Sequence, residues 1–415
     1  MMASPTPFRI NVSNDDLELL RKKLELARLP DQPDGYDLNQ GVPVPRMTEL
    51  VEYWKLTYLP KWRQTEEKLN QLPMFTQSIN MGEFGDLNVH FIHQRSEAQD
   101  AIPLLFVHGW PGSFLEAIKL LPLLTEEGDH QSFHVVCPSL PNYGFSQGVT
   151  KRGFSLKHYG DVCNKLMLSL GYSRYVAQGG DWGSMITRMM GRYHTDSLRA
   201  VHVNLAAIIP STLLTAPLVL LKSILSFPFW TAAEKQGLKN GREYATSGNG
   251  YYIMQNTRPQ TVAYCLSDSP IALLGWIYEK LEHWTDDYPW TNDEILTWIS
   301  IYWFSTAGPG ASVRTYFEAS DSSPDYGDGA ARDTAYFGFT KVPLGITQFP
   351  KDIVGIPRVF TQMLGKVVFQ NWAEDGGHFA AWERPQVLAD ALRKMFKDGG
   401  EAFGIVAEGE GKKEM

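Results

Sequence analysis

The chain contains 415 residues, 43% of them hydrophobic and 20% charged, with a formal net charge of −8. This is the composition of a globular protein, and an acidic chain without a stripe of Lys and Arg disfavours nucleic-acid binding. Three cysteines, an odd number in a chain too large to need disulfides, favour a reducing compartment and form no zinc-binding pattern. The first residues lack the pattern of a signal peptide, so we expect a cytoplasmic protein.

Residues 1–74 are predicted to form an N-terminal helical segment. Leucines recur at helical spacing after Ser13, a candidate N-cap; they are Leu17, Leu20 and Leu24. A second amphipathic stretch lies over 47–72, where Pro60 predicts a break. Between the two, residues 31–45 are rich in Gly, Pro, Asp and Asn and indicate a long connecting loop.

The hydrophobic pattern changes its period near residue 75. Two runs of alternating hydrophobic residues flank a turn at Gly85 and Asp86, and short β-rich runs then alternate with helical patterns. This order predicts an α/β fold, with a mainly parallel sheet covered on both faces by helices and formed by residues 75–207 and 341–405. In such sheets the active site lies at the carboxyl ends of the strands.

An inserted helical cap is predicted over 208–340, where Trp- and Tyr-rich helical patterns occur without strands. The most apolar stretch of the chain, 205–230, overlaps its start. Three prolines and Lys222 divide this stretch into pieces shorter than the roughly 20 residues of a membrane span, so we expect short helices lining a dry pocket and no integral membrane span. The charged tail 406–415 is expected to be disordered.

The pattern Gly179-x-Asp181-x-Gly183 follows an apolar strand and precedes a helical pattern. An aspartate in this place can be the N-cap of the helix. The same strand-to-helix turn holds the nucleophile of α/β-hydrolases, usually a serine, and the glycines would permit its strained backbone. The helix N-terminus would keep a carboxylate there ionised. Taken alone, the pattern leaves both interpretations open.

A second motif, FVHGWPG at 106–112, directly follows an apolar strand. In the α/β-hydrolase arrangement this loop supplies one oxyanion-hole N–H, and the residue after the nucleophile supplies the other. The candidate donors are therefore the amides of Trp110 and Trp182. We expect His108 to be a structural residue that hydrogen-bonds the loop.

The general base and the acid that orients it are expected after the last two strands, because nucleophile, acid, histidine is the α/β-hydrolase chain order. The stretch NWAEDGGHFAAWERP supplies His378 as the base, and PLGITQFPKD supplies Asp352 as the acid. Asp375 is nearer to His378 in the sequence, but in the same tight loop it is poorly placed to reach the far ring nitrogen.

A carboxylate nucleophile suits substitution at a saturated carbon. A serine would become an ether that water does not readily cleave, whereas an aspartate forms an ester whose carbonyl a histidine-activated water can attack. The reaction is then either the opening of an epoxide or the displacement of a halide. An epoxide oxygen needs proton donors, and the predicted cap offers tyrosines for this role: Tyr251, Tyr252 and Tyr316.

Together these residues resemble the microsomal-type epoxide hydrolases, including the soluble fungal members and the insect juvenile hormone epoxide hydrolases. The resemblance runs from about Pro7 to Arg384 and includes PFRINVSNDDLELLRKKLELARLP, HGWPGS, QGGDWGS, GYYIMQNTRPQTVAYCLSDSP, FPKD and GGHFAAWERP. It implies an α/β-hydrolase fold with a helical cap, an N-terminal segment that wraps around the core, and no cofactor. The first residues show no hydrophobic anchor of the kind that membrane-bound relatives carry, so the soluble fungal branch is favoured.

The resemblance also assigns roles to individual residues. Asp181 is implied as the nucleophile, His378 as the base and Asp352 as the orienting acid. Two tyrosines are implied to open the ring, with Tyr252 as the substitute for the first if the local alignment shifts by one residue; these two are Tyr251 and Tyr316.

The expected reaction is hydrolysis of a small apolar epoxide by water to a vicinal diol through an aspartyl ester, and a homodimer is left open. The alternatives are a haloalkane dehalogenase with the same nucleophile, a serine esterase that uses Ser184, and a non-catalytic ligand-binding protein on this fold. The cap tyrosines and the N-terminal segment argue against the dehalogenase. The complete set of site residues argues against the ligand-binding protein.

Overall fold

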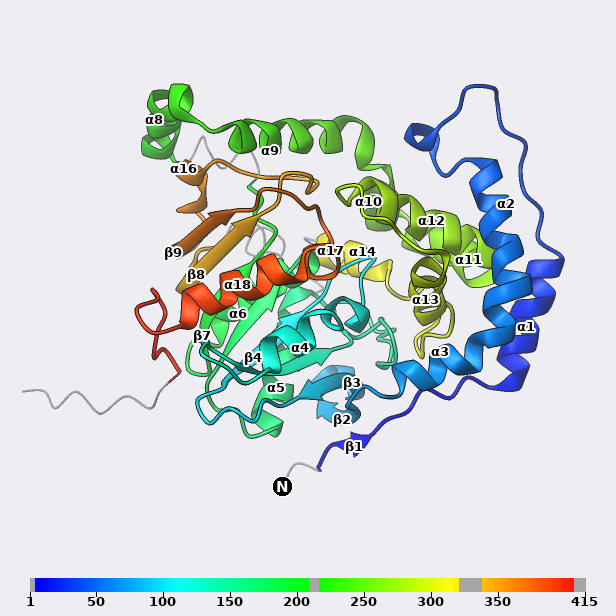
Figure 1. Ribbon diagram of the computed structural model, residues 1–415, viewed down its shortest axis with the longest axis horizontal. Coiled ribbons are helices and arrows are strands. Elements are labelled where there is room, and N and C mark those ends of the chain that lie inside the picture. Colours follow the sequence, from blue (N-terminus) through cyan, green and yellow to red (C-terminus); the bar gives the residue numbers. More distant parts are fainter. Residues whose placement is uncertain (1–3, 209–215, 321–337, 407–415) are drawn as a thin grey trace, which may run out of the picture.

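A nine-stranded sheet crosses the molecule in the computed structural model, which describes residues 4–208, 216–320 and 338–406 (Figure 1). Its strands are β1 (Thr6–Pro7), β2 (Met74–Asn80), β3 (Asp86–Gln94), β4 (Ile102–Val107), β5 (Phe133–Pro138), β6 (Tyr175–Gly179), β7 (Leu198–Val203), β8 (Thr340–Gln348) and β9 (Gly365–Trp372). Their order across the sheet is β1-β2-β3-β5-β4-β6-β7-β8-β9.

The sheet is antiparallel at one edge and parallel through the rest. Strands β1, β2, β3 and β5 pair antiparallel, whereas every neighbouring pair from β5 to β9 is parallel. The hairpin predicted around Gly85 is confirmed, and Gly85 has the positive φ of 76° that its turn requires. The buried central strands consist of continuous apolar runs such as Leu104–Val107, as expected for strands covered on both faces. The predicted α/β fold is confirmed.

Helices cover the sheet and form the inserted cap. The helices are α1 (Asn14–Glu25), α2 (Val44–Tyr53), α3 (Trp62–Leu69), α4 (Leu120–Thr125), α5 (Leu156–Ser169), α6 (Trp182–Tyr193), α8 (Pro217–Ser226), α9 (Ala232–Glu243), α10 (Gly250–Thr257), α11 (Pro259–Asp268), α12 (Pro270–His283), α13 (Asn292–Trp303), α14 (Arg314–Ser320), α16 (Arg358–Thr361), α17 (Ala380–Glu383) and α18 (Pro385–Phe396). Helices α5 and α6 pack together on one face of the sheet, and α4 and α18 pack together on the other (Figure 1).

Short helical turns connect these elements. They are η1 (Leu38–Gln40), η2 (Trp54–Tyr58), η3 (Leu59–Lys61), η4 (Gly82–Phe84), η5 (Phe114–Ala117), η6 (Phe227–Phe229) and η7 (Tyr244–Gly248). Pro60 lies in η3, so the expected break is a tightened turn between α2 and α3.

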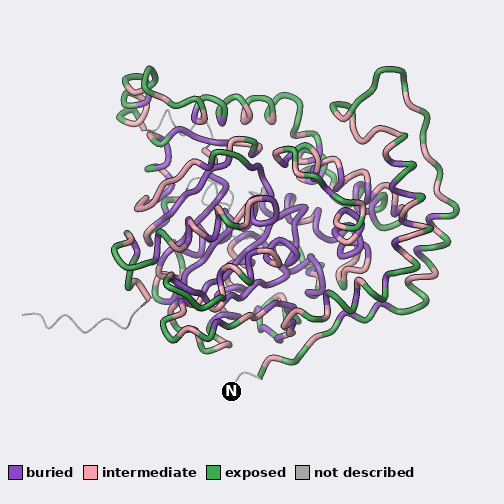
Figure 2. The backbone as a smooth tube through the Cα atoms, viewed as in Figure 1, coloured by how far each residue is buried: buried purple, intermediate pink, exposed green. Residues whose placement is uncertain are grey.

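The described residues between β7 and β8 form helices joined by turns and loops and contain no strand, as the cap prediction requires. The expectation that the apolar stretch 205–230 lines the pocket holds only at its start, where Leu205 and Ala207 line it. Residues 209–215 of this stretch lie outside the described part of the chain. Helix α8, within the apolar stretch 205–230, does not line the pocket but lies at a corner of the molecule (Figure 2). Its exposed apolar side chains include Leu218, Leu225 and, in the following turn, Phe229. Apolar composition alone did not reveal which side of the helix is covered.

The N-terminal segment runs along the core and the cap (Figure 1), and it is not purely helical. Its first residues form β1, which pairs with β2 and adds the edge strand to the sheet. Helix α1 begins after Ser13, whose side chain accepts a hydrogen bond from the amide of Asp16, so the predicted N-cap is confirmed. Contacts to the cap include the ion pair of Lys23 with Asp268, at 2.7 Å.

No helix among the described residues combines the length and the apolar character needed to cross a membrane. Residues 407–415 of the predicted tail lie outside the described part of the chain.

Glu66 on α3 fixes the arm that leads from β1 to α1. Its carboxylate accepts hydrogen bonds from the amide of Val12, at 2.7 Å, and from the guanidinium of Arg63, at 2.7 Å. Asn70, one turn further on, exchanges hydrogen bonds with both backbone groups of Ile10. Because Glu66 is buried, loss of its carboxylate leaves polar groups without partners.

The substitution Glu66→Ala should lower the free energy of unfolding by about 2 kcal/mol, because it removes a buried, charge-assisted set of hydrogen bonds. It should also expose residues 4–12 to faster proteolysis. Denaturant unfolding and limited proteolysis measure the two effects. Glu67→Ala is the matched control, since Glu67 is exposed and pairs only with exposed Arg9. Equal effects of the two substitutions would contradict the anchoring role of Glu66.

Candidate active site

Asp181 stands at a sharp turn between β6 and α6, with φ 48° and ψ −127°. A positive φ in a non-glycine residue is strained. The sequence predicts that the flanking glycines permit this strained backbone. Neither Gly179 nor Gly183 has a positive φ, so they permit it by leaving space. A Cβ on Gly179 would lie 2.2 Å from the carbonyl oxygen of Gly183, and one on Gly183 would lie 2.0 Å from that of Val107. The side chain of Asp181 makes no capping hydrogen bond, so the N-cap interpretation is wrong.

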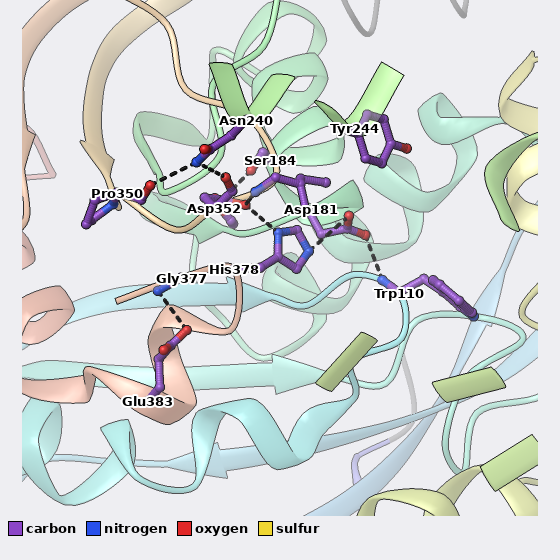
Figure 3. Close-up of polar contacts among 12 residues, drawn as sticks. Trp110, Asp181, Ser184, Asn240, Tyr244, Pro350, Asp352, Gly377, His378 and Glu383 are labelled. Atoms are coloured by element: carbon purple, nitrogen blue, oxygen red, sulfur yellow. Dashed lines mark hydrogen bonds and ion pairs between the residues drawn. The ribbon is translucent and has the colours of Figure 1, made fainter. Parts of the chain in front are cut away.

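The carboxylate of Asp181 lies between the loop after β4 and His378 (Figure 3). The amide of Trp110 donates a hydrogen bond to Oδ1 of Asp181 at 2.7 Å. Oδ2 lies 3.4 Å from Nε2 of His378. A Cβ on Gly109 would lie 2.2 Å from Oδ1, so only glycine lets this loop approach the carboxylate. Trp182, the second oxyanion candidate, begins α6 directly after Asp181.

His108 has the structural place expected from the sequence. Its buried ring donates from Nδ1 to the carbonyl of Gly109 at 3.0 Å and accepts at Nε2 from the amide of Leu140 at 3.2 Å. Both nitrogens are therefore used within the fold. Burial lowers the pKa of His108 to about 4, which keeps the ring neutral.

His378 and Asp352 form a buried pair at the ends of neighbouring parallel strands. Asp352 follows β8, His378 follows β9, and Nδ1 of His378 lies 2.7 Å from Oδ1 of Asp352. Asp375 instead pairs with Arg384 at 2.8 Å. Of the two aspartates considered from the sequence, Asp352 is therefore the one that contacts His378. The backbone N–H of His378 donates to the carbonyl of Trp284 in the cap at 2.7 Å.

The protonation of His378 depends on two carboxylates. Burial lowers the pKa of His378, but the charges of Asp352 and Asp181 outweigh burial and raise this pKa to about 10. At neutral pH the imidazole is therefore cationic and paired with Asp181. Any reaction that neutralises Asp181 removes one of the two negative charges that stabilise the imidazolium, and it therefore lowers the pKa of His378.

A cavity of about 240 Å³ opens beside Asp181. It is lined by Asp181, Trp182, Met185, Leu205, Ala207, Tyr244, Ala245, Asn249, Tyr251, Tyr252, Tyr316, Ile353 and Val354. All three tyrosines named from the sequence thus reach the cavity, and so does Tyr244, which was not anticipated. Apart from the carboxylate of Asp181, these side chains carry no charge.

The hydroxyl groups of the cavity tyrosines are held in different ways. Tyr251 is buried, and its hydroxyl lies 3.2 Å from that of Tyr244. Tyr316 is also buried, and its side chain interacts with the hydroxyl of Tyr251. Burial raises the pKa of both Tyr251 and Tyr316 well above its ordinary value, so both groups remain protonated donors at neutral pH.

Residues that the sequence did not reveal support the two loops. Asn240 of α9 donates to the carbonyls of Pro350 and Asp352, at 2.8 and 2.9 Å, and so ties the cap to the acid-bearing loop (Figure 3). Glu383 accepts from the amide of Gly377 at 2.9 Å, which holds the loop of His378. Asn240 stands in no recognisable motif, because it acts through a contact between distant parts of the chain. Glu383 lies within GGHFAAWERP, but the motif gave no sign of its contact with the amide of Gly377.

Glu116 is a further buried carboxyl group at this site. It lies in η5, and a Cβ on Gly112 would come 1.6 Å from its Oε1. Burial raises the pKa of Glu116 to about 8, which the charge of His378 partly offsets. In the sequence, the only sign of a buried carboxyl group here is the position of Glu116 within the mostly apolar run FLEAIKLL. The described residues contain no cluster of His, Cys, Asp and Glu that could hold a metal ion.

Comparison with known proteins agrees with this geometry. Residues 5–117 match the family model of the epoxide hydrolase N terminus, and residues 102–250 match that of the alpha/beta hydrolase fold. Epoxide hydrolase 1 of Sus scrofa is 31% identical over 94% of this chain and 88% of its own length.

Solved structures show the same likeness. The epoxide hydrolase of Aspergillus niger is 34% identical, with a TM-score of 0.77 over 94% of this chain and 95% of that one. The juvenile hormone epoxide hydrolase of Bombyx mori is 28% identical, with a TM-score of 0.83 over 94% and 93%. The chain therefore belongs to the microsomal-type epoxide hydrolase family and has the α/β-hydrolase fold.

Proposed function

We propose that this epoxide hydrolase opens small apolar epoxides to vicinal diols through a covalent ester on Asp181. The observation that carries the proposal is the position of the Asp181 carboxylate. It lies between the amide of Trp110 and the imidazole of His378, at the edge of a cavity that tyrosines line. This arrangement supplies a nucleophile, a base and proton donors around one small space.

The first step is attack by Oδ2 of Asp181 on an epoxide carbon. The carbon–oxygen bond of the ring breaks, and its electron pair goes to the epoxide oxygen. Tyr251 and Tyr316 donate hydrogen bonds and a proton to this oxygen as it becomes an alkoxide. Their burial supports this role, because hydrogen bonds to a developing charge are strong where water is excluded.

The second step is hydrolysis of the ester. Esterification removes the charge of Asp181, so the pKa of His378 falls, and the imidazolium releases a proton that returns the phenolate of the first step to a phenol. The neutral ring can then take a proton from water. The resulting hydroxide attacks the carbonyl carbon of the ester. The amides of Trp110 and Trp182 stabilise the oxyanion. When the ester bond breaks, the leaving alkoxide takes the proton of the added hydroxyl group, which releases the diol and restores the carboxylate. Asp352 orients the imidazole and stabilises its cation throughout.

The side chains of the cavity favour an uncharged substrate. Beyond the nucleophile, the tyrosines, Trp182 and Asn249, its wall is apolar, formed by residues such as Met185, Leu205, Ile353 and Val354. Burial of a charged substituent against these groups would cost its hydration without a partner. The favoured substrates are therefore aryl or alkyl epoxides.

The other reactions considered from the sequence have less support. A dehalogenase needs donors for a departing halide, whereas this cavity is lined by tyrosines, which suit an alkoxide, and the comparisons identify epoxide hydrolases. Ser184 is fully buried, and its hydroxyl donates to the carbonyl of Gly179 at 3.0 Å, so it is not available as an esterase nucleophile.

A single turnover in ¹⁸O-labelled water, with enzyme in excess over a styrene-type epoxide, should place the label in the peptide that contains Asp181. The diol of that turnover should carry no label, because its new oxygen comes from the carboxylate. Mass spectrometry of the peptide and of the diol measures both. Label that enters the diol directly and is absent from the peptide would exclude the ester.

His378→Gln provides the control for the same experiment. Without a base the second step should slow by at least about 10²-fold, while the first continues. The peptide with Asp181 should then gain the mass of one substrate molecule. Asp181→Ala should form neither the ester nor the diol.

Tyr251→Phe and Tyr316→Phe should each slow ester formation by about 10- to 100-fold and leave ester hydrolysis largely unchanged, because the hydroxyl groups act on the epoxide oxygen. Rapid-mixing kinetics under single-turnover conditions separate the two steps. Tyr252→Phe is the matched control, since Tyr252 also lines the cavity and follows Tyr251 directly. If Tyr252→Phe has the large effect and Tyr251→Phe the small one, the two assignments must be exchanged.

Asp181→Asn should lower the pKa of His378 from about 10, because the amide keeps the shape of the carboxylate but not its charge. Proton NMR of the imidazole over a pH series measures this shift. Asp161→Asn is the control, because Asp161 pairs with a different histidine, His194, at 2.8 Å. An unchanged pKa in Asp181→Asn would show that Asp181 does not control the protonation of His378.

A further inference from the structure

Lys280 is a buried cation beside the cavity that the proposed mechanism does not use. It stands on α12 with an exposed fraction of 5%, and its Nζ lies 2.6 Å from Oε1 of Glu279. The same Nζ lies over the ring of Tyr251, 4.9 Å from the ring centroid, and 5.9 Å from that of Trp284. One face of a proposed ring-opening tyrosine is thus next to a positive charge.

The burial of this ammonium group is costly. An ammonium removed from water loses hydration that a single ion pair does not fully restore. The other buried side chains of α12 are mostly apolar, as in Leu274, Ile277 and Leu281. A methionine of similar length would fill the same space without this cost. The presence of an ammonium group here despite this cost therefore points to a functional role for Lys280.

The ring of Tyr251 has a defined place in the site. It stacks on the indole of Trp110, with centroids 5.1 Å apart and planes at 11°. Trp110 also gives the amide that binds Asp181. The phenol that points into the cavity is thereby fixed relative to both the nucleophile and the ammonium group, so the distance from Lys280 to Tyr251 is set by packing on two sides.

We infer that Lys280 is a positioning residue that stabilises the negative charge which Tyr251 acquires when the epoxide ring opens. The inference rests on the proposed function. As the carbon–oxygen bond breaks, Tyr251 donates its proton toward the epoxide oxygen, and negative charge spreads from the phenol oxygen into the ring. A cation near the face of that ring attracts this charge more strongly than it attracts the neutral phenol. Lys280 itself gains and loses no proton.

This role predicts an effect on one half of the reaction. Ester formation creates the charge on Tyr251, whereas ester hydrolysis depends on His378 and the oxyanion donors. The same end of α12 also contacts the base, because the carbonyl of Trp284 accepts from the N–H of His378. A purely structural lysine would therefore affect both steps when it is removed.

The test compares Lys280→Met with Lys280→Arg in single-turnover kinetics with a styrene-type epoxide. Lys280→Met should slow ester formation about tenfold and change ester hydrolysis less than twofold. The loss should be smaller for a para-nitro styrene oxide, whose alkoxide needs less assistance. Lys280→Arg, which keeps the charge, should recover most of the rate. The matched control is Lys119→Met, because Lys119 also lies over aromatic rings, at 4.0 Å from Trp382, but outside the cavity.

The outcomes are distinguishable. Ester formation within twofold of wild type in Lys280→Met would overturn the inference, as would equal losses in both steps or an arginine variant no faster than the methionine variant. If Lys280→Met does not fold, Lys280→Gln provides the uncharged comparison. Wild-type enzyme that forms no ester on Asp181 would overturn the proposed function and the inference with it. Normal wild-type turnover with an unaffected methionine variant would overturn the inference alone.

Discussion

The attraction between the carboxylate of Asp181 and the imidazolium of His378 sets the requirements for the rest of the site. Both groups are largely removed from water, so each needs the other and needs further polar contacts. Trp110 supplies one contact through its amide and Asp352 supplies another through its carboxylate. In the proposed reaction the substrate neutralises Asp181, which changes this balance and turns the imidazole from a counter-ion into a base. One pair of charges thereby links the two chemical steps that we propose.

The sheet brings these groups together because its central strands are parallel and end at one edge. Loops after β4, β6, β8 and β9 meet there, and each contributes one part of the site. The cap then fixes the two loops that carry the acid and the base, through the side chain of Asn240 and the carbonyl of Trp284. The cap is thus a support for the catalytic loops as well as a wall of the cavity.

The sequence predicted the parts of the site that lie at strand ends, because strand, turn and helix patterns are local. Asp181, His378 and Asp352 could be placed in this way, and the structure brings them together. Asn240 and Lys280 could not, since they stand on ordinary helices and matter only through tertiary contacts. The strand β1 was missed because two residues carry no alternation pattern, and the exposure of α8 was missed because composition does not define a helix's neighbours.

The path of the N-terminal segment limits how the cap can move. One end of the segment is paired with the sheet through β1, and its helices contact the cap, where Lys23 binds Asp268 and the hydroxyl of Tyr53 donates to Asp293 at 2.9 Å. The segment is therefore a tether between the two parts. A cap held in this way cannot swing open about its own connections without releasing those contacts.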